Sequence, residues 1–148
     1  MVTFTRSKFK QYGLDQYVEY AEYLAGGYGL LRNLSAKGIK KLFSDARKKG
    51  NKGKDFIEEV ANNPYVKQTK TQRAKSKKSY EKLKKEHEDK LDNYKKNPEK
   101  YDDDGRLKNA KTPEEREKII QGRVSVLESQ IKKHEGEIKK IEQANEYD

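Results

Sequence analysis

The chain has 148 residues, of which 31% are hydrophobic and 41% are charged. An average soluble domain has about 45–50% apolar residues (glycine included) and about 25% charged residues, so thin helical layers are favoured over a thick globular core. Cysteine is absent and there are two histidines, which argues against disulfides, thiolate metal sites and histidine-rich metal sites; we assign no metal and no cofactor. No stretch approaches the ~18 apolar residues of a membrane span, so no membrane partner is expected.

The first 66 residues are predicted to form a cluster of three short helices. Residues 1–13 are expected to be irregular or a short strand, and apolar residues at three- and four-residue steps predict a helix over 14–28. Ser35 is a candidate N-cap for the second helix. The apolar face of that helix comprises Ile39, Leu42, Phe43 and Ala46. The third helix carries Phe56, Ile57 and Val60.

Two long helices are predicted in the rest of the chain. Residues 68–96 contain no glycine or proline. Their sparse seam consists of Tyr80, Leu83, His87, Leu91 and Tyr94. Thr112, Pro113 and Glu115 form the clearest local signal, a capping box that begins a second helix. The heptad series that follows it is Ile120, Val124, Leu127, Ile131, His134, Ile138 and Ile141.

These elements predict an all-α fold with two parts. Residues 1–66 form the cluster of short helices, and residues 67–148 form a long, antiparallel, coiled-coil-like hairpin. A connection of about fifteen residues makes the antiparallel arrangement the economical one. Placing Tyr94 opposite Glu115 sets His87 beside Arg123.

The net charge of +10 is concentrated in one stretch. From residue 67 to residue 85 there are nine basic residues and one acid, Glu81. Such a stripe attracts nucleic acid through counterion release, and a solvated lysine-rich helix is the alternative interpretation. The candidate nucleic-acid-binding residues are Lys67, Lys70, Arg73, Lys75, Lys77, Lys78, Lys82, Lys84 and Lys85.

His87 is the candidate catalytic residue. In the register above, a neutral imidazole at His87 would remove the 2′-hydroxyl proton of RNA, and Lys90 and Arg123 would stabilise the phosphorane. These roles describe a metal-independent ribonuclease, for which no general acid is identified. The alternatives are a structural polar residue in the helix seam and a Mg²⁺ nuclease site at the acid cluster 102–104.

Four segments of the chain are similar in sequence to a known group of proteins. Residues 87–94 read His-Glu-Asp-Lys-Leu-Asp-Asn-Tyr, and residues 97–102 read Asn-Pro-Glu-Lys-Tyr-Asp. Residues 105–110 read Gly-Arg-Leu-Lys-Asn-Ala, and residues 119–123 read Ile-Ile-Gln-Gly-Arg. Over about residues 80–135 the chain resembles the C-terminal toxin domains of Rhs-type and related bacterial polymorphic toxins.

The resemblance implies an interbacterial effector domain, delivered as the end of a larger protein and neutralised by a cognate immunity protein. Many such domains are nucleases. The polar residues that match the recurring motif are His87, Lys90, Lys108, Asn109, Arg116 and Arg123. The effector would act in the cytoplasm of the target cell; without the toxin interpretation a cytoplasmic location is expected. Its immunity protein would be acidic, since charge complementarity speeds capture.

Three classes of function therefore stay open. The first is a toxin nuclease with RNA as the favoured substrate. The second is a non-enzymatic, basic helical protein that binds nucleic acid. The third is a coiled-coil adaptor or structural protein.

Overall fold

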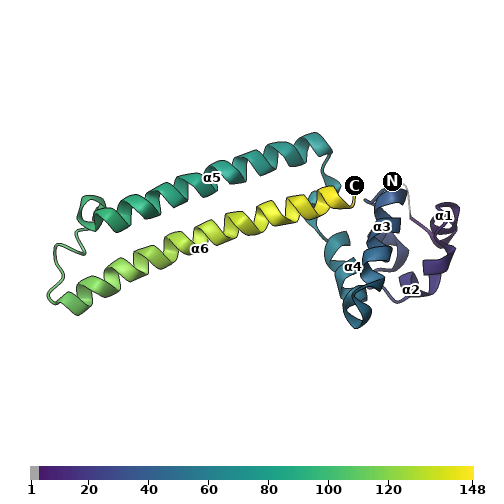
Figure 1. Ribbon diagram of the computed structural model, residues 1–148, viewed down its shortest axis with the longest axis horizontal. Coiled ribbons are helices and arrows are strands. Elements are labelled where there is room, and N and C mark those ends of the chain that lie inside the picture. The colour runs from purple at the N-terminus through teal and green to yellow at the C-terminus, as the bar shows by residue number, and fades with distance from the viewer. Residues whose placement is uncertain (1–3) are drawn as a thin grey trace. The chain divides into compact units, whose positions relative to one another are not determined.

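A computed structural model describes residues 4–148, and all of its regular elements are helices (Figure 1). No strand occurs between residues 4 and 148, and 77% of these described residues are helical. The predicted all-α class is confirmed. None of the helices in this range is long and apolar enough to cross a membrane.

The chain divides into two compact units. The first comprises the residues up to Ala74 together with Lys140–Asp148, and the second comprises Lys75–Lys139. The division falls after residue 74, whereas the sequence suggested a boundary after residue 66. The last nine residues, 140 to 148, belong with the first unit because their apolar side chains are buried there.

Helix α1 (Arg6–Gln11) lies where the sequence predicted an irregular segment or a strand. The hydroxyl of Thr5 caps the helix by accepting a hydrogen bond from the backbone N–H of Lys8, at 3.3 Å. Phe9 is fully buried, and its ring packs edge-on against that of Phe43, with 5.6 Å between centroids. Six residues are too few for a stable isolated helix, so tertiary packing is what holds α1 in place.

The single helix predicted over 14–28 is wrong, because this stretch is broken into shorter pieces. A 3₁₀ turn at Asp15–Tyr17 leads into α2 (Val18–Glu22), and a second 3₁₀ helix covers Gly27–Leu31. Gly26, just before the second 3₁₀ helix, has φ +83°, a left-handed conformation that an α-helix cannot contain, so no single helix spans this stretch.

Helices α3 (Ala36–Arg47) and α4 (Gly53–Ala61) lie where the sequence predicts them. The hydroxyl of Ser35 accepts a hydrogen bond from the backbone N–H of Gly38 at 2.9 Å, as expected of an N-cap. The predicted apolar face of α3 is fully buried: Ile39, Leu42, Phe43 and Ala46. Of the residues expected on the third helix, Ile57 and Val60 are fully buried.

The end of the chain completes the core of the first unit. Ile141, Ala144 and Tyr147 are buried, and the Tyr147 hydroxyl donates a hydrogen bond to the Asp45 carboxylate at 2.7 Å. Gly38 approaches this segment so closely that a Cβ atom there would lie 1.9 Å from the Tyr147 carbonyl oxygen. Only glycine fits at this position.

The second unit contains most of α5 (Lys70–Lys96) and α6 (Pro113–Glu146). The predicted start of α6 is confirmed, since the Thr112 hydroxyl accepts a hydrogen bond from the Glu115 backbone N–H at 3.1 Å. The Glu115 carboxylate in turn accepts from the backbone N–H of Lys111, one residue earlier than an ideal capping box.

Two groups of side-chain contacts join α5 to α6. Tyr94 is buried with Val124 and Leu127. Towards the other end of α5, the His87 and His134 rings lie 5.0 Å apart between centroids. The register predicted from the sequence, with Tyr94 opposite Glu115 and His87 beside Arg123, is therefore wrong by several turns.

The connection between the helices explains the shift in register. The Asp102 carboxylate accepts hydrogen bonds from the backbone N–H groups of Leu107 and Lys108, both at 3.0 Å, which folds the loop onto itself. Glu99 forms an ion pair with Arg116 in the second turn of α6. Because the connection lies along the first turns of α6, the side chains of α5 pack against α6 only beyond those turns.

Candidate nucleic-acid interface

Four lysines form one exposed stripe along α5, which we call the lysine face: Lys75, Lys78, Lys82 and Lys85. Their spacing of three, four and three residues puts them on one side of the helix, over about 15 Å. Lys85 lies 3.7 Å from Asp89. In residues 4–148 no carboxylate lies within ion-pair distance of Lys75, Lys78 or Lys82. The charges of these three lysines are therefore available to a ligand.

Two other lysines of the predicted set are already paired. Lys77 lies 4.0 Å from Glu81. Lys84 is shared between Glu88 at 3.5 Å and Glu135 at 3.4 Å, so its ammonium group joins the two helices. Because their charge is partly neutralised, these residues contribute less to binding a polyanion.

Arg73 lies inside the first unit and does not belong to an exposed surface. Its side chain is 2% exposed. The guanidinium donates to the carbonyl oxygens of Tyr65 and Gln68, to Asn145 Oδ1 at 2.7 Å and to Asp148 Oδ2 at 2.6 Å. This arginine is a structural group that ties the chain end to the start of α5, and we leave it out of the interface.

Lys67 and Lys70 are exposed. Both belong to the first unit, whereas the lysine face belongs to the second. The candidate interface therefore lies on the second unit alone.

The rings of His87 and His134 lie side by side between the helices, tilted by 52° to each other. The His134 ring lies 5.0 Å from His87 and 6.0 Å from Tyr80, measured between centroids. His87 Nδ1 is 2.7 Å from the Leu83 carbonyl oxygen, so Nδ1 donates there and Nε2 is left for another partner. Burial lowers the pKa of His134, and the neighbouring His87 and Lys133 lower it further. The sequence placed His134 well away from His87, and the structure brings the two imidazoles together.

The other two candidate catalytic residues lie elsewhere. Arg123 precedes His134 by eleven residues, which is about 16 Å along a continuous helix. It lies near Tyr94, whose pKa is raised by burial and lowered in part by the charge of Arg123. Lys90 follows His87 by one turn and is exposed. The geometry thus joins His87 to a second histidine and separates it from the predicted guanidinium.

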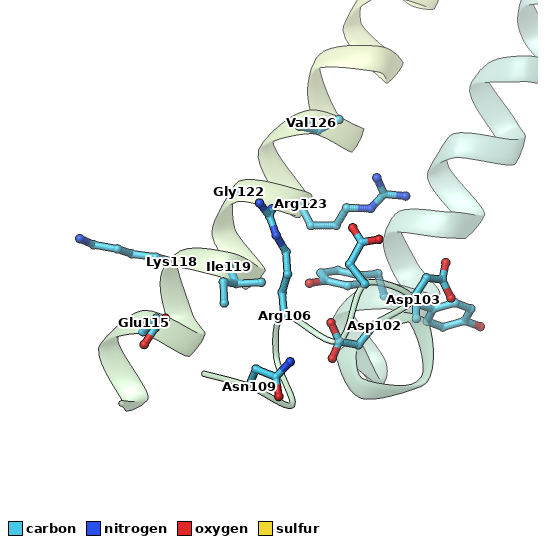
Figure 2. Close-up of a pocket in the computed structure, with 13 residues that line it drawn as sticks. Asp102, Asp103, Arg106, Asn109, Glu115, Lys118, Ile119, Gly122, Arg123 and Val126 are labelled. Atoms are coloured by element: carbon cyan, nitrogen blue, oxygen red, sulfur yellow. The ribbon is translucent and has the colours of Figure 1, made fainter. Parts of the chain in front are cut away.

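An open pocket of about 920 Å³ lies where the connection meets α6 (Figure 2). We call it the linker pocket. It is lined by Tyr94, Tyr101, Asp102, Asp103, Asp104, Arg106, Asn109, Glu115, Lys118, Ile119, Gly122, Arg123 and Val126. Two of the six polar residues that match the toxin motif, Asn109 and Arg123, are in this lining. The sequence offered the acid cluster 102–104 only as an alternative Mg²⁺ site and gave no sign of a pocket there, because the connection reads as a polar loop.

Metal-ligand chemistry finds little support in residues 4–148. No group of three histidine, aspartate or glutamate side chains in that range is arranged to hold an ion. In the acid cluster, both oxygens of Asp102 accept backbone hydrogen bonds, which lowers its pKa.

Comparison of the chain with models of protein families, with curated proteins and with solved structures finds no match. The similarity to polymorphic toxins stays a prediction from the sequence motifs.

Proposed function

We propose that this chain binds nucleic acid, with RNA favoured, through the lysine face of α5. The observation that carries the proposal is the row of four exposed lysines, three of them without a carboxylate partner within ion-pair distance in residues 4–148. A row of ammonium groups over about 15 Å spans several phosphates of an extended strand, and each contact releases a condensed counterion.

We infer that α5 and α6 act as an antiparallel, coiled-coil-like hairpin that holds this row straight. The cluster of Tyr94 with Val124 and Leu127 supports this inference at one end, and the ion pair of Lys84 with Glu135 supports it further along. A rigid helix presents the lysines at fixed spacing, so less conformational freedom is lost on binding.

The proposed biological setting is that of an effector domain of the polymorphic-toxin type, acting in the cytoplasm of a target cell. The motif resemblance over about residues 80–135 supports it. In that setting an acidic immunity protein would cover the same lysines, because a negative surface competes directly with RNA for them.

The test is a binding measurement with two matched triple variants of the full chain. The first combines Lys75→Gln, Lys78→Gln and Lys82→Gln. The control changes three exposed lysines of the first unit: Lys37→Gln, Lys40→Gln and Lys48→Gln. Both variants lose three positive charges, so they differ only in where on the chain those charges are removed. Fluorescence anisotropy with a labelled RNA should show affinity falling about tenfold or more for the first variant and much less for the control. Equal losses in both would overturn the proposal.

A metal-independent ribonuclease is a second candidate, favoured by one specific observation: the 5.0 Å separation of the His87 and His134 rings. Cleavage of RNA needs a base that takes the 2′-hydroxyl proton and an acid that protonates the leaving 5′-oxygen. Two neighbouring imidazoles offer one group for each role. The lowered pKa of His134 favours its neutral form, so it suits the base.

The test of this activity uses His87→Ala and His134→Ala in the presence of a chelator. Each variant should lose about 10²–10⁴-fold in cleavage rate. Circular dichroism identifies any variant that has also lost its helices. Full cleavage by either folded variant, or activity abolished by the chelator alone, would overturn the mechanism. RNA binding by the wild type without any cleavage would leave a pure binding protein.

A further inference from the structure

The linker pocket is a candidate ligand site separate from the lysine face. All of its lining residues lie between 94 and 126, within the second unit. Its volume of about 920 Å³ falls in the range of small-molecule sites, about 300–1,000 Å³. Figure 2 shows Arg106 reaching from the connection toward α6 near Gly122 and Arg123 reaching from α6 toward α5, whereas Lys118 points outward.

Some of the charged groups in the pocket are already committed to the fold. Both carboxylate oxygens of Asp102 accept backbone hydrogen bonds, and Glu115 accepts one from Lys111. These two acids therefore hold the connection and the start of α6 in shape.

The remaining charges have no partner of their own. In residues 4–148, Arg106 and Arg123 lie within ion-pair distance of no carboxylate, and Asp103 and Asp104 are exposed without a hydrogen bond from any side chain. The pocket thus offers two guanidinium groups and two free carboxylates at the same place. A ligand that is anionic at one end and a hydrogen-bond donor at the other would complement these charges.

The pocket also carries exposed apolar surface. Tyr101 is 43% exposed and Val126 is 48% exposed, and both are in the lining. The Lys100 ammonium lies 5.7 Å from the centroid of the Tyr101 ring. An exposed tyrosine ring next to cations provides a platform on which a base stacks, a contact worth about 1–3 kcal/mol per base.

We propose that the linker pocket binds an unpaired guanine nucleotide. The base would stack on Tyr101, the phosphate would meet Arg106 and Arg123, and the carboxylates of Asp103 and Asp104 would face the base edge. Guanine carries two adjacent donors on its Watson–Crick edge, N1–H and the exocyclic amine, which one carboxylate accepts together. Adenine, cytosine and uracil lack that adjacent pair. Single-stranded RNA is recognised through such edges and through stacking.

Where the guanine is part of an RNA, this proposal rests on the proposed function and names the base that the RNA carries. Where the guanine is a free nucleotide, the proposal does not depend on RNA binding. A free guanine mononucleotide has the same base edge and phosphate. The two sources are distinguished by the ligand used in the test.

The first arm of the test titrates the full chain with GMP, AMP, CMP and UMP, followed by NMR chemical shifts. GMP should bind at least tenfold more tightly than the other three, with shifts at residues 101–106 and 119–126. Equal response to all four, or none at millimolar GMP, would overturn the proposal.

Variants assign the roles within the pocket. Arg123→Gln should weaken every nucleotide about tenfold, whereas Lys132→Gln, an exposed cation of α6 outside the pocket, should not. Asp103→Asn combined with Asp104→Asn should erase the preference for GMP, and Asp92→Asn is its control. Unchanged preference in the double variant would exclude these carboxylates as the base reader and overturn the assignment.

The second arm uses oligonucleotides and the variant with Lys75, Lys78 and Lys82 changed to Gln. An oligoadenylate with one guanosine should bind better than oligoadenylate alone. If this difference is absent while GMP still binds, the pocket stands and its ligand is the free nucleotide. The triple lysine variant should lose RNA affinity and keep GMP binding, so failure of the lysine face and failure of the pocket give different results.

Discussion

Replacing the buried Arg73 by methionine should destabilise the first unit sharply. Methionine keeps much of the side-chain length and removes the charge and all donors. The variant loses the 2.6 Å ion pair with Asp148 and the hydrogen bond to Asn145, and it leaves the Tyr65 carbonyl oxygen without this donor. Breaking one side of a buried ion pair costs about 3–5 kcal/mol. The Asp148 side chain is 47% exposed and regains water, so the lower end, about 3 kcal/mol, is expected.

For a chain of this length each kcal/mol shifts the Tm by about 2–4 °C, so Arg73→Met should lower the Tm by roughly 6–12 °C. Thermal unfolding followed by circular dichroism measures this directly. Lys75→Met is the matched control, since the exposed Lys75 two residues later should change stability by less than about 0.5 kcal/mol. A Tm for Arg73→Met within 2 °C of the wild type would refute the structural role of the guanidinium.

Further predictions concern two glycines and the histidine pair. Gly136→Ala should raise the free energy of unfolding by up to about 1 kcal/mol, because it lies inside α6 and a Cβ there meets no atom within 4 Å. Gly38→Ala should lower the free energy of unfolding, because its Cβ would overlap the Tyr147 carbonyl. Urea titration measures both glycine variants, and a stabilised Gly38→Ala would contradict the close packing. The pKa of His134 is lower in the folded state than in the unfolded state, where it is about 6.5. Below that pH the unfolded state binds more protons, so the free energy of unfolding is highest above that pH and decreases as the pH falls below it. Urea midpoints at pH 7 and pH 5 should differ less in His134→Gln than in the wild type, and an equal difference would show that folding does not lower the pKa of His134.

Helix starts and apolar faces were predictable because their causes are local. Ser35 and Thr112 each cap a helix through a hydrogen bond to a backbone N–H three residues ahead, which the sequence shows directly. The face of α3 follows from helical spacing alone. Helix α1 was missed because it is stabilised by the burial of Phe9 against Phe43, a contact between residues far apart in the chain.

The candidate site was predictable only in part, for the same physical reason. The exposed row on α5 follows from lysine spacing within one helix. The burial of Arg73 depends on Asn145 and Asp148, more than seventy residues away, and a count of charges cannot reveal those partners. The pairing of His87 with His134 depends on how the connection folds along α6, which the Asp102 hydrogen bonds determine.

The salt dependence of RNA binding is the most direct measurement of the role of the lysine face. For single strands the slope of log K against log salt concentration is about −0.7 per phosphate contact, so four lysines predict a slope near −2.8. The variant with Lys75, Lys78 and Lys82 changed to Gln should give a slope shallower by about 2 in the same titration. An unchanged slope in that variant would contradict the assignment of these lysines as the phosphate contacts.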